Sequence, residues 1–122
     1  SSSLDPNGFR NVPGELITVP VTSIDAVVPA GVKVDIAKID VEKFEHCVLN
    51  GMARVLAESQ PAIVIECLPD GPYEAVERIL SKFGYRFYHL RCQGPVPVSG
   101  IVPDTSGRFR NYLCRTQDSI AC

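Results

Sequence analysis

The sequence predicts an α/β domain with a partial doubly wound, mainly parallel sheet. Two apolar runs, residues 34–39 and 62–67, have the composition of strands that are covered on both faces. Each run precedes a segment with helical spacing, residues 41–58 and 72–83. Because strands that alternate with helices usually pair in parallel, these segments predict a parallel sheet with helices on its faces. The 122 residues fit a single domain.

The first part of the chain predicts one more strand and a short helix. Residues 16–22 alternate apolar and polar side chains and are rich in β-branched residues, which predicts a strand. Pro20 would confine that strand to an edge, a strand end or a bulge. Residues 22–28 favour a short helical turn, with Thr22 or Ser23 as its cap.

The last part of the chain predicts two further strands. Residues 85–90 alternate as a strand after Gly84, a residue that suits the end of a helix. Residues 111–115 predict a final short strand, antiparallel to its neighbour. Residues 91–109 carry three prolines and three glycines and are expected to form a loop, as are residues 1–14.

Composition and charge argue against two classes of partner. The formal net charge is -2 and no basic cluster is present, which does not suit a nucleic-acid-binding protein. The longest apolar run is far shorter than the roughly 20 residues that span a bilayer. The opening residues, Ser1 to Pro6, lack the pattern of a secretory signal. A cytoplasmic protein without a membrane partner is therefore expected.

The cysteines are interpreted as reduced structural residues. They are odd in number and form no CxxC pair, and several lie in apolar segments, where a thiol behaves as a small hydrophobe. A disulfide framework and a zinc site are the alternatives. The five are Cys47, Cys67, Cys92, Cys114 and Cys122.

Carboxylates stand where both buried strands end. Asp40 follows the first strand and Glu66 ends the second. Because the carboxyl ends of parallel strands meet at one edge, where ligands bind, we expect the two side chains to lie side by side. Asp40 either caps the following helix or accepts hydrogen bonds from a cofactor ammonium or a substrate hydroxyl. Glu66 either pairs with Lys38, Arg86 or a backbone N–H, or acts as a general base whose pKa is raised by burial.

Other polar residues give weaker indications. On a helix, Glu42 and His46 would be neighbours four residues apart, as a surface pair or as ligands of a shared group. A magnesium or calcium site from Asp40, Glu42, His46 and Glu66 is an alternative. His89, within a predicted strand, is expected to pack or to be exposed rather than to act in catalysis. The glycines form no GxGxxG pattern, so no phosphate-binding loop is predicted.

The chain carries one pattern over residues 34–51 and 61–66 and another over residues 19–25. Both resemble the FkbM family of S-adenosylmethionine-dependent methyltransferases. The family pattern is close to V-D-x-x-K-I-D-V-E-G-x-E-x-x-V-L-x-G, followed by a proline and an apolar strand that ends in glutamate. Here it corresponds to residues 34–51 and then to Pro61 through Glu66. Residues 19–25 resemble the family's V-x-V-x-T-L-D segment. Lys43 stands where the family usually has glycine.

The resemblance implies the C-terminal half of a class I methyltransferase fold, which is Rossmann-like. The family's glycine-bearing loop after its first strand has no counterpart in these 122 residues, which are expected to form one domain. A half of this kind is expected to self-associate or to need a missing N-terminal half.

The implied function is methyl transfer from S-adenosylmethionine to a hydroxyl of a small molecule or sugar. By position, the resemblance implies Asp40, Glu42 and Glu66 as catalytic residues, and Asp40 and Val41 as cofactor-binding residues, with no metal. The alternative is a non-catalytic α/β interaction domain that has lost cofactor binding.

Overall fold

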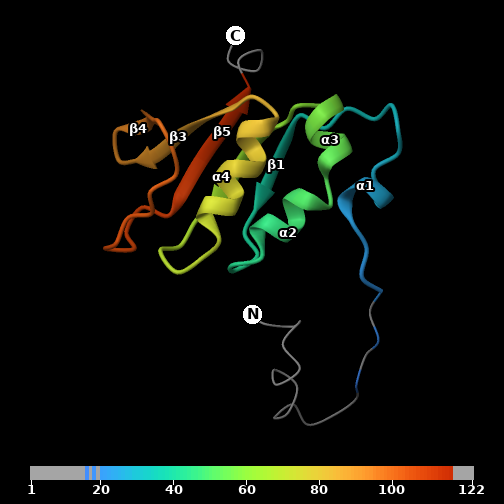
Figure 1. Ribbon diagram of the computed structural model, residues 1–122, viewed down its shortest axis with the longest axis horizontal. Coiled ribbons are helices and arrows are strands. Elements are labelled where there is room, and N and C mark those ends of the chain that lie inside the picture. Colours follow the sequence, from blue (N-terminus) through green and yellow to red (C-terminus); the bar gives the residue numbers. More distant parts are fainter. Residues whose placement is uncertain (1–15, 17, 19, 117–122) are drawn as a thin grey trace.

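A computed structural model describes residues 16, 18 and 20–116, and within them a five-stranded mixed sheet carries helices on one face (Figure 1). The strands lie in the order β1-β2-β5-β3-β4. Predicted loop residues 1–14 lie outside this range. The elements are α1 (Ile24–Val27), β1 (Ile36–Ile39), α2 (Glu45–Asn50), α3 (Ala53–Glu58), β2 (Ala62–Glu66), α4 (Tyr73–Lys82), β3 (Tyr85–Arg91), β4 (Gly94–Val98) and β5 (Asn111–Thr116).

The α/β class is confirmed, but the prediction of a mainly parallel sheet was wrong. Only β1 and β2 pair in parallel among these strands, whereas β2–β5, β5–β3 and β3–β4 are antiparallel. Parallel neighbours need a long crossover, usually a helix. After β3 the described chain forms no further helix: it turns back at Cys92 and Gln93 into β4, and β5 then enters between β2 and β3.

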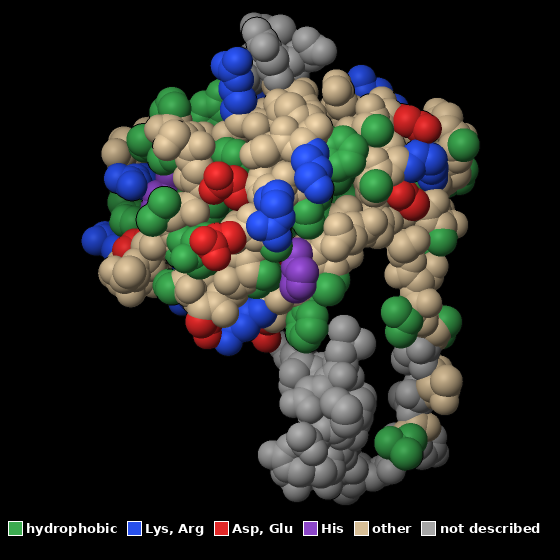
Figure 2. Space-filling model, in the orientation of Figure 1, with side chains coloured by type: hydrophobic (Ala, Val, Ile, Leu, Met, Phe, Trp, Pro, Cys, Tyr) green, Lys and Arg blue, Asp and Glu red, His purple; other side chains and the backbone are tan. Residues whose placement is uncertain are grey.

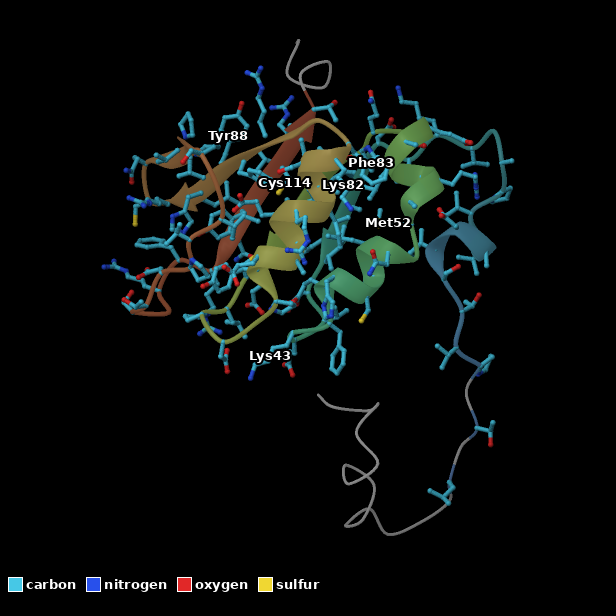
Figure 3. The ribbon with its side chains drawn as sticks, viewed as in Figure 1. Lys43, Met52, Lys82, Phe83, Tyr88 and Cys114 are labelled. Carbon is cyan, nitrogen blue, oxygen red and sulfur yellow. The ribbon has the colours of Figure 1, made fainter. Side chains whose placement is uncertain are left out.

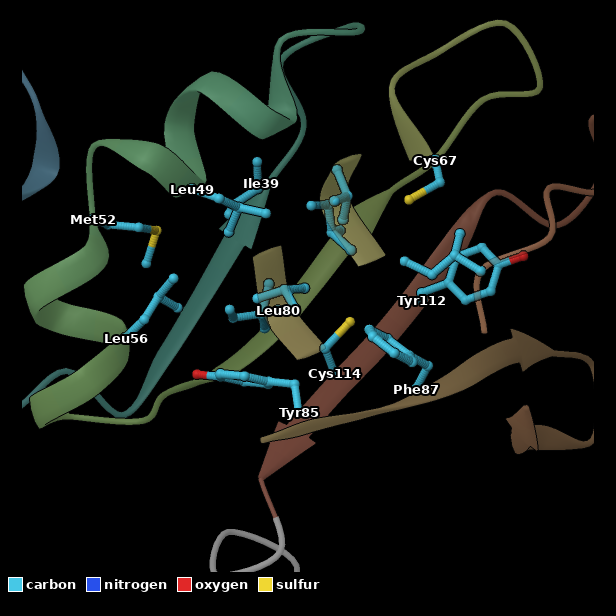
Figure 4. Close-up of a cluster of buried hydrophobic side chains, with 14 of the residues drawn as sticks. Ile39, Leu49, Met52, Leu56, Cys67, Leu80, Tyr85, Phe87, Tyr112 and Cys114 are labelled. Atoms are coloured by element: carbon cyan, nitrogen blue, oxygen red, sulfur yellow. The ribbon is translucent and has the colours of Figure 1, made fainter. Parts of the chain in front are cut away.

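The prediction of a doubly wound sheet was also wrong for this part of the chain. Buried and less buried residues alternate along β2 and β5, and the buried face packs against α2, α3 and α4 (Figures 1 and 4). Leu49, Leu56 and Leu80 from these helices are fully buried. On the other face, where no helix within residues 20–116 lies, Ile36 is 65% exposed and Lys38 is also exposed.

The predicted strand at residues 16–22 is not formed by the residues described there, namely 16, 18 and 20–22. Leu16 and Val21 are each 85% exposed. Alternation of apolar and polar residues favours a strand only when a neighbouring strand is available, and none of the described strands pairs with this segment. The short helix that follows is confirmed as α1, and the Ser23 hydroxyl accepts a hydrogen bond from the Ala26 N–H at 3.2 Å.

The single helix predicted over residues 41–58 is divided into α2 and α3. The break lies at Gly51 and Met52, where α1 docks. The Gly51 carbonyl accepts a hydrogen bond from the Asp25 N–H at 2.9 Å, and a Cβ at Gly51 would lie only 3.1 Å from Cβ of Ser23. The Asp25 carboxylate caps the new helix by accepting from the N–H groups of Arg54 at 2.8 Å and Val55 at 3.1 Å.

The predicted loop at 91–109 contains the strand β4, which was missed. Its sequence, GPVPV, includes Pro95 and Pro97, which cannot donate to a sheet ladder. An edge strand tolerates prolines, because its outward N–H groups have no partner strand. β4 is such an edge, paired only with β3.

The remaining elements agree with prediction. β1 and β2 lie within the two apolar runs, and β3 and β5 extend one residue beyond their predicted ends. α4 begins after Pro72, and Gly84 has φ +82°, a left-handed conformation that terminates the helix. None of the helices in the described residues has both the length and the apolar content needed to cross a bilayer.

Candidate active site

The structure brings Asp40 and Glu66 together at one edge of the sheet. β1 and β2 are parallel neighbours, with Ile39 opposite Ile65, so the residues that follow lie at the same edge. The Asp40 and Glu66 carboxyl groups share a hydrogen bond. Asp40 is exposed, whereas the Glu66 side chain is only 17% exposed. A solvent-facing carboxyl therefore lies beside a largely buried one.

The surroundings of Glu66 favour its protonated form. Burial is the main cause that raises the pKa of Glu66, followed by the charge of Asp40 and the hydrogen bond with it. Arg110 opposes this shift, since its Nη1 lies 3.9 Å from Oε2 of Glu66. Arg110 is the cation here, rather than the predicted Lys38 or Arg86.

Glu45 is a third acidic residue of the site, which the sequence did not reveal. A glutamate at a helix start is typically exposed and favours the helix dipole, but Glu45 is 3% exposed. Its Oε2 accepts a hydrogen bond from the Lys43 N–H at 3.2 Å and so closes the turn after β1. Its negative charge contributes to the raised pKa of Glu66. The helix-start position was visible in the sequence, whereas the burial was not.

The turn after β1 has a backbone that favours glycine. Glu42 has φ +48° and Lys43 has φ +79°, both in the left-handed region. This conformation explains why the related pattern has glycine at the position of Lys43. Lys43 lies in the loop after β1 (Figure 3), and its Nζ is 2.6 Å from Oδ2 of Asp70, so an ion pair joins the loops that follow β1 and β2. The hydrogen bond to Asp70 raises the pKa of Lys43.

Glu42 and His46 were expected to be neighbours on one helix, but Glu42 lies outside it because α2 begins only at Glu45. The His46 Nε2 lies 3.6 Å from Sγ of Cys47. Val41, next to Asp40, is 39% exposed. Within residues 20–116 and at positions 16 and 18, no group of three or more potential ligands could hold a metal ion, so the alternative metal site is not assembled.

His89 is buried and packs against its neighbours, which is one of the two alternatives predicted for it. It is 3% exposed and stacks on the Tyr112 ring, with the ring centroids 4.5 Å apart. The Arg91 Nε can only donate, and it lies 3.0 Å from Nδ1 of His89. The proton of the neutral ring therefore sits on Nε2, which donates to the Phe109 carbonyl at 2.9 Å.

The cysteines in the described part of the chain are free thiols. Cys67 and Cys114 are buried, and burial raises the pKa of Cys67 to about 12. Such thiols act as small apolar side chains in the core (Figure 4). Cys47 and Cys92 are exposed, and Cys122 lies outside the described residues.

These features define an α/β domain with a paired-carboxyl site at the edge where β1 and β2 end. The family model described as the methyltransferase FkbM domain matches residues 1–87. The chain therefore belongs to this family, which confirms the resemblance and supports a methyltransferase activity in general terms. No curated protein and no solved structure matches the chain. Asp40, Glu45 and Glu66 lie within the matched residues, and Arg110 lies beyond them.

Proposed function

We propose that this chain forms the catalytic edge of an S-adenosylmethionine-dependent O-methyltransferase whose acceptor is a hydroxyl of a small molecule or sugar. The hydrogen-bonded Asp40–Glu66 pair carries this proposal, because it lies at the carboxyl edge of two parallel strands in a chain of the FkbM methyltransferase family. Such edges are where open α/β sheets bind ligands.

The residues at this edge fit the chemistry of the cofactor. S-adenosylmethionine supplies an electrophilic methyl group on a cationic sulfonium, together with an ammonium group. The carboxyls of Asp40, Glu45 and Glu66 are close enough to act on one another, so the edge favours a cation. Asp40 is exposed and would accept hydrogen bonds from the ammonium, with Val41 beside it.

A hydroxyl that becomes methylated must lose its proton, and in this proposal Glu66 accepts it. A raised pKa makes the ionised Glu66 a stronger base than an ordinary glutamate. Asp40 would orient the hydroxyl or take the same proton, because the two carboxyls share a hydrogen bond. Glu42, in the left-handed turn, is a further candidate. Much of the acceleration would come from holding the hydroxyl in line with the methyl group.

The proposal is tested by following backbone amide signals of the isotope-labelled chain by NMR while S-adenosylmethionine is added. The 122 residues contain no GxGxxG loop, so we expect weak, saturable binding that shifts the amides of Asp40 and Val41. Asp40→Asn should weaken the binding. Asp35→Asn makes the same change at an exposed carboxylate at the other end of the strand and should leave it unchanged. If no amide at this edge shifts near the solubility limit of the cofactor, the proposal fails.

The proton-acceptor role needs a turnover assay. Release of S-adenosylhomocysteine would be measured with a set of sugar and small-alcohol acceptors. Glu66→Gln should lower the rate by about 10²–10⁴-fold, the usual contribution of a general base. A rate equal to that of the wild type would remove Glu66 as the base.

A second candidate is the non-catalytic interaction domain, which the Lys43–Asp70 ion pair favours. This pair bridges the two loops beside the carboxyls, where a cofactor would enter. Lys43→Gly restores the residue typical of the family and removes the bridge. Tighter S-adenosylmethionine binding by this variant would support the enzyme, whereas an absence of binding in both forms would favour the interaction domain.

A further inference from the structure

A small hollow lies beside the carboxyl pair on the face of the sheet that has no helix among the described residues. Its volume is about 230 Å³. Lys38 and Val64 stand opposite each other in β1 and β2, and both line it. Asn111, opposite Glu66 in the sheet, also lines it. The hollow and the proposed reaction centre are therefore adjacent.

The charged residues that line the hollow are all positive. Its lining includes three cations, Lys38, Arg108 and Arg110, and no carboxylate. Glu66 lies 3.9 Å from Arg110, and the Asp104 carboxylate accepts a hydrogen bond from the N–H of Phe109, which lines the hollow. The helix-covered face, by contrast, shows acidic and basic side chains interspersed (Figure 2). Three cations in the lining of one hollow suit a dianion better than a monoanion.

Apart from Asn111, the rest of the lining is apolar. Val64, Leu90 and Phe109 contribute to the walls. The guanidinium carbon of Arg108 lies 5.1 Å from the centre of the Phe109 ring, which holds this cation over an aromatic face. A ligand with a charged group and an apolar or ring-shaped body matches this combination.

The loop that carries Arg108 and Phe109 is held in place before any ligand arrives. The Asp104 carboxylate accepts hydrogen bonds from the Ser106 N–H at 2.9 Å and the Phe109 N–H at 3.2 Å. The buried His89 donates to the Phe109 carbonyl at 2.9 Å and so ties the loop to β3. Because the loop is already ordered, its loss of conformational entropy on binding would be small.

We propose that this hollow binds the phosphate monoester of the methyl acceptor and so presents a neighbouring hydroxyl to the Asp40–Glu66 pair. This assignment deepens the proposed function and rests on it for its role in catalysis. Arg108 and Arg110 lie outside residues 1–87, the part matched by the family. Part of the hollow is thus built by a segment beyond the matched residues, which can set the acceptor class of this chain independently of the shared reaction centre.

The test is an NMR titration of the isotope-labelled chain with phenyl phosphate at neutral pH and low salt. We expect saturable shifts at the amides of Lys38, Leu90 and the segment 108–111. Benzyl alcohol, which has a ring without charge, should produce none of them. Benzoate, with a single charge, should bind more weakly than phenyl phosphate. Equal binding of benzyl alcohol or benzoate, or shifts spread over other surfaces, would overturn the assignment.

Matched variants locate the site. Arg108→Gln and Lys38→Met should each weaken phenyl phosphate binding by about tenfold, because each removes a charged contact. Arg78→Gln, an exposed arginine on α4 across the sheet, removes the same charge and should change nothing. Thermal unfolding checks that all three remain folded. Equal affinities for Arg108→Gln and Arg78→Gln would refute the proposal.

The experiments can refute each of the two proposals independently of the other. Binding of phenyl phosphate without any binding of S-adenosylmethionine would refute the methyltransferase and leave an anion site. Binding of S-adenosylmethionine without phenyl phosphate would keep the methyltransferase and refute the phosphate subsite.

Discussion

Replacing Asp25 by alanine tests how the helices that cover β1 are held. The Asp25 carboxylate lies in α1 and accepts the N–H groups of Arg54 and Val55, at 2.8 and 3.1 Å. These donors belong to the first turn of α3, where N–H groups have no partner within the helix. Alanine leaves both donors without their acceptor.

The expected cost follows from this geometry. Loss of a helix-capping side chain typically costs about 0.5–2 kcal/mol. Asp25 is partly buried and makes two such bonds with a charged acceptor, which places the loss in the upper half of that range, about 1–2 kcal/mol. For a domain of about 100 residues, the melting temperature should fall by roughly 5–15 °C.

Circular dichroism during heating and urea unfolding provides the measurement. Asp25→Asn keeps one carbonyl acceptor and should fall between wild type and alanine. Asp35→Ala, the same change at an exposed aspartate, should shift the midpoint little. If Asp25→Ala and Asp35→Ala melt together, the carboxylate does not hold α3, and the account of the break at Gly51 is wrong.

Three further predictions concern the site and the core. The pKa of Glu66 is raised in the folded state, so its contribution to stability is full below the unfolded pKa, near 4.5, and is lost as the pH rises through the folded value. Glu66→Gln should therefore melt at a higher temperature than the wild type at neutral pH, and at the same temperature below pH 4.5. An equal increase in melting temperature at both pH values would show that burial does not raise the pKa of Glu66. At position 43, where φ is +79°, Lys43→Gly should be more stable than Lys43→Ala in urea, because both lose the ion pair and only alanine retains the strain. Iodoacetamide should alkylate the exposed thiols of Cys47 and Cys92 before the buried thiols of Cys67 and Cys114, as followed by mass spectrometry. Rapid labelling of the buried thiols in the native protein would show that the core is open.

Much of the acidic edge was predictable from the sequence. Two buried runs separated by a helical segment predict adjacent parallel strands, and a parallel pair places the residues after Ile39 and Ile65 at one edge. The meeting of Asp40 and Glu66 follows from that rule. Left-handed backbone at Lys43 was signalled only by the glycine of the related pattern, because lysine itself carries no such indication.

Other parts of the site depend on contacts between residues far apart in the chain. Arg110 reaches Glu66 because β5 enters the sheet between β2 and β3, a placement that no local pattern indicates. The strand β4 escaped prediction because its prolines argue against a strand unless it lies at an edge. The helix expected over 41–58 is divided because α1, from a distant segment, docks at Gly51.

The sequence by itself determined the α/β class, the position of the two acidic strand ends and the family of the chain. These properties depend on local periodicity and on residue types at short spacing, which physical chemistry links to structure without knowledge of the fold. The tertiary structure alone decided the position of β5 between β2 and β3, the burial of Glu45 and the cationic hollow beside Glu66. Those features depend on which strands pair in the sheet, because burial and charge at such contacts are set by residues that are distant along the chain.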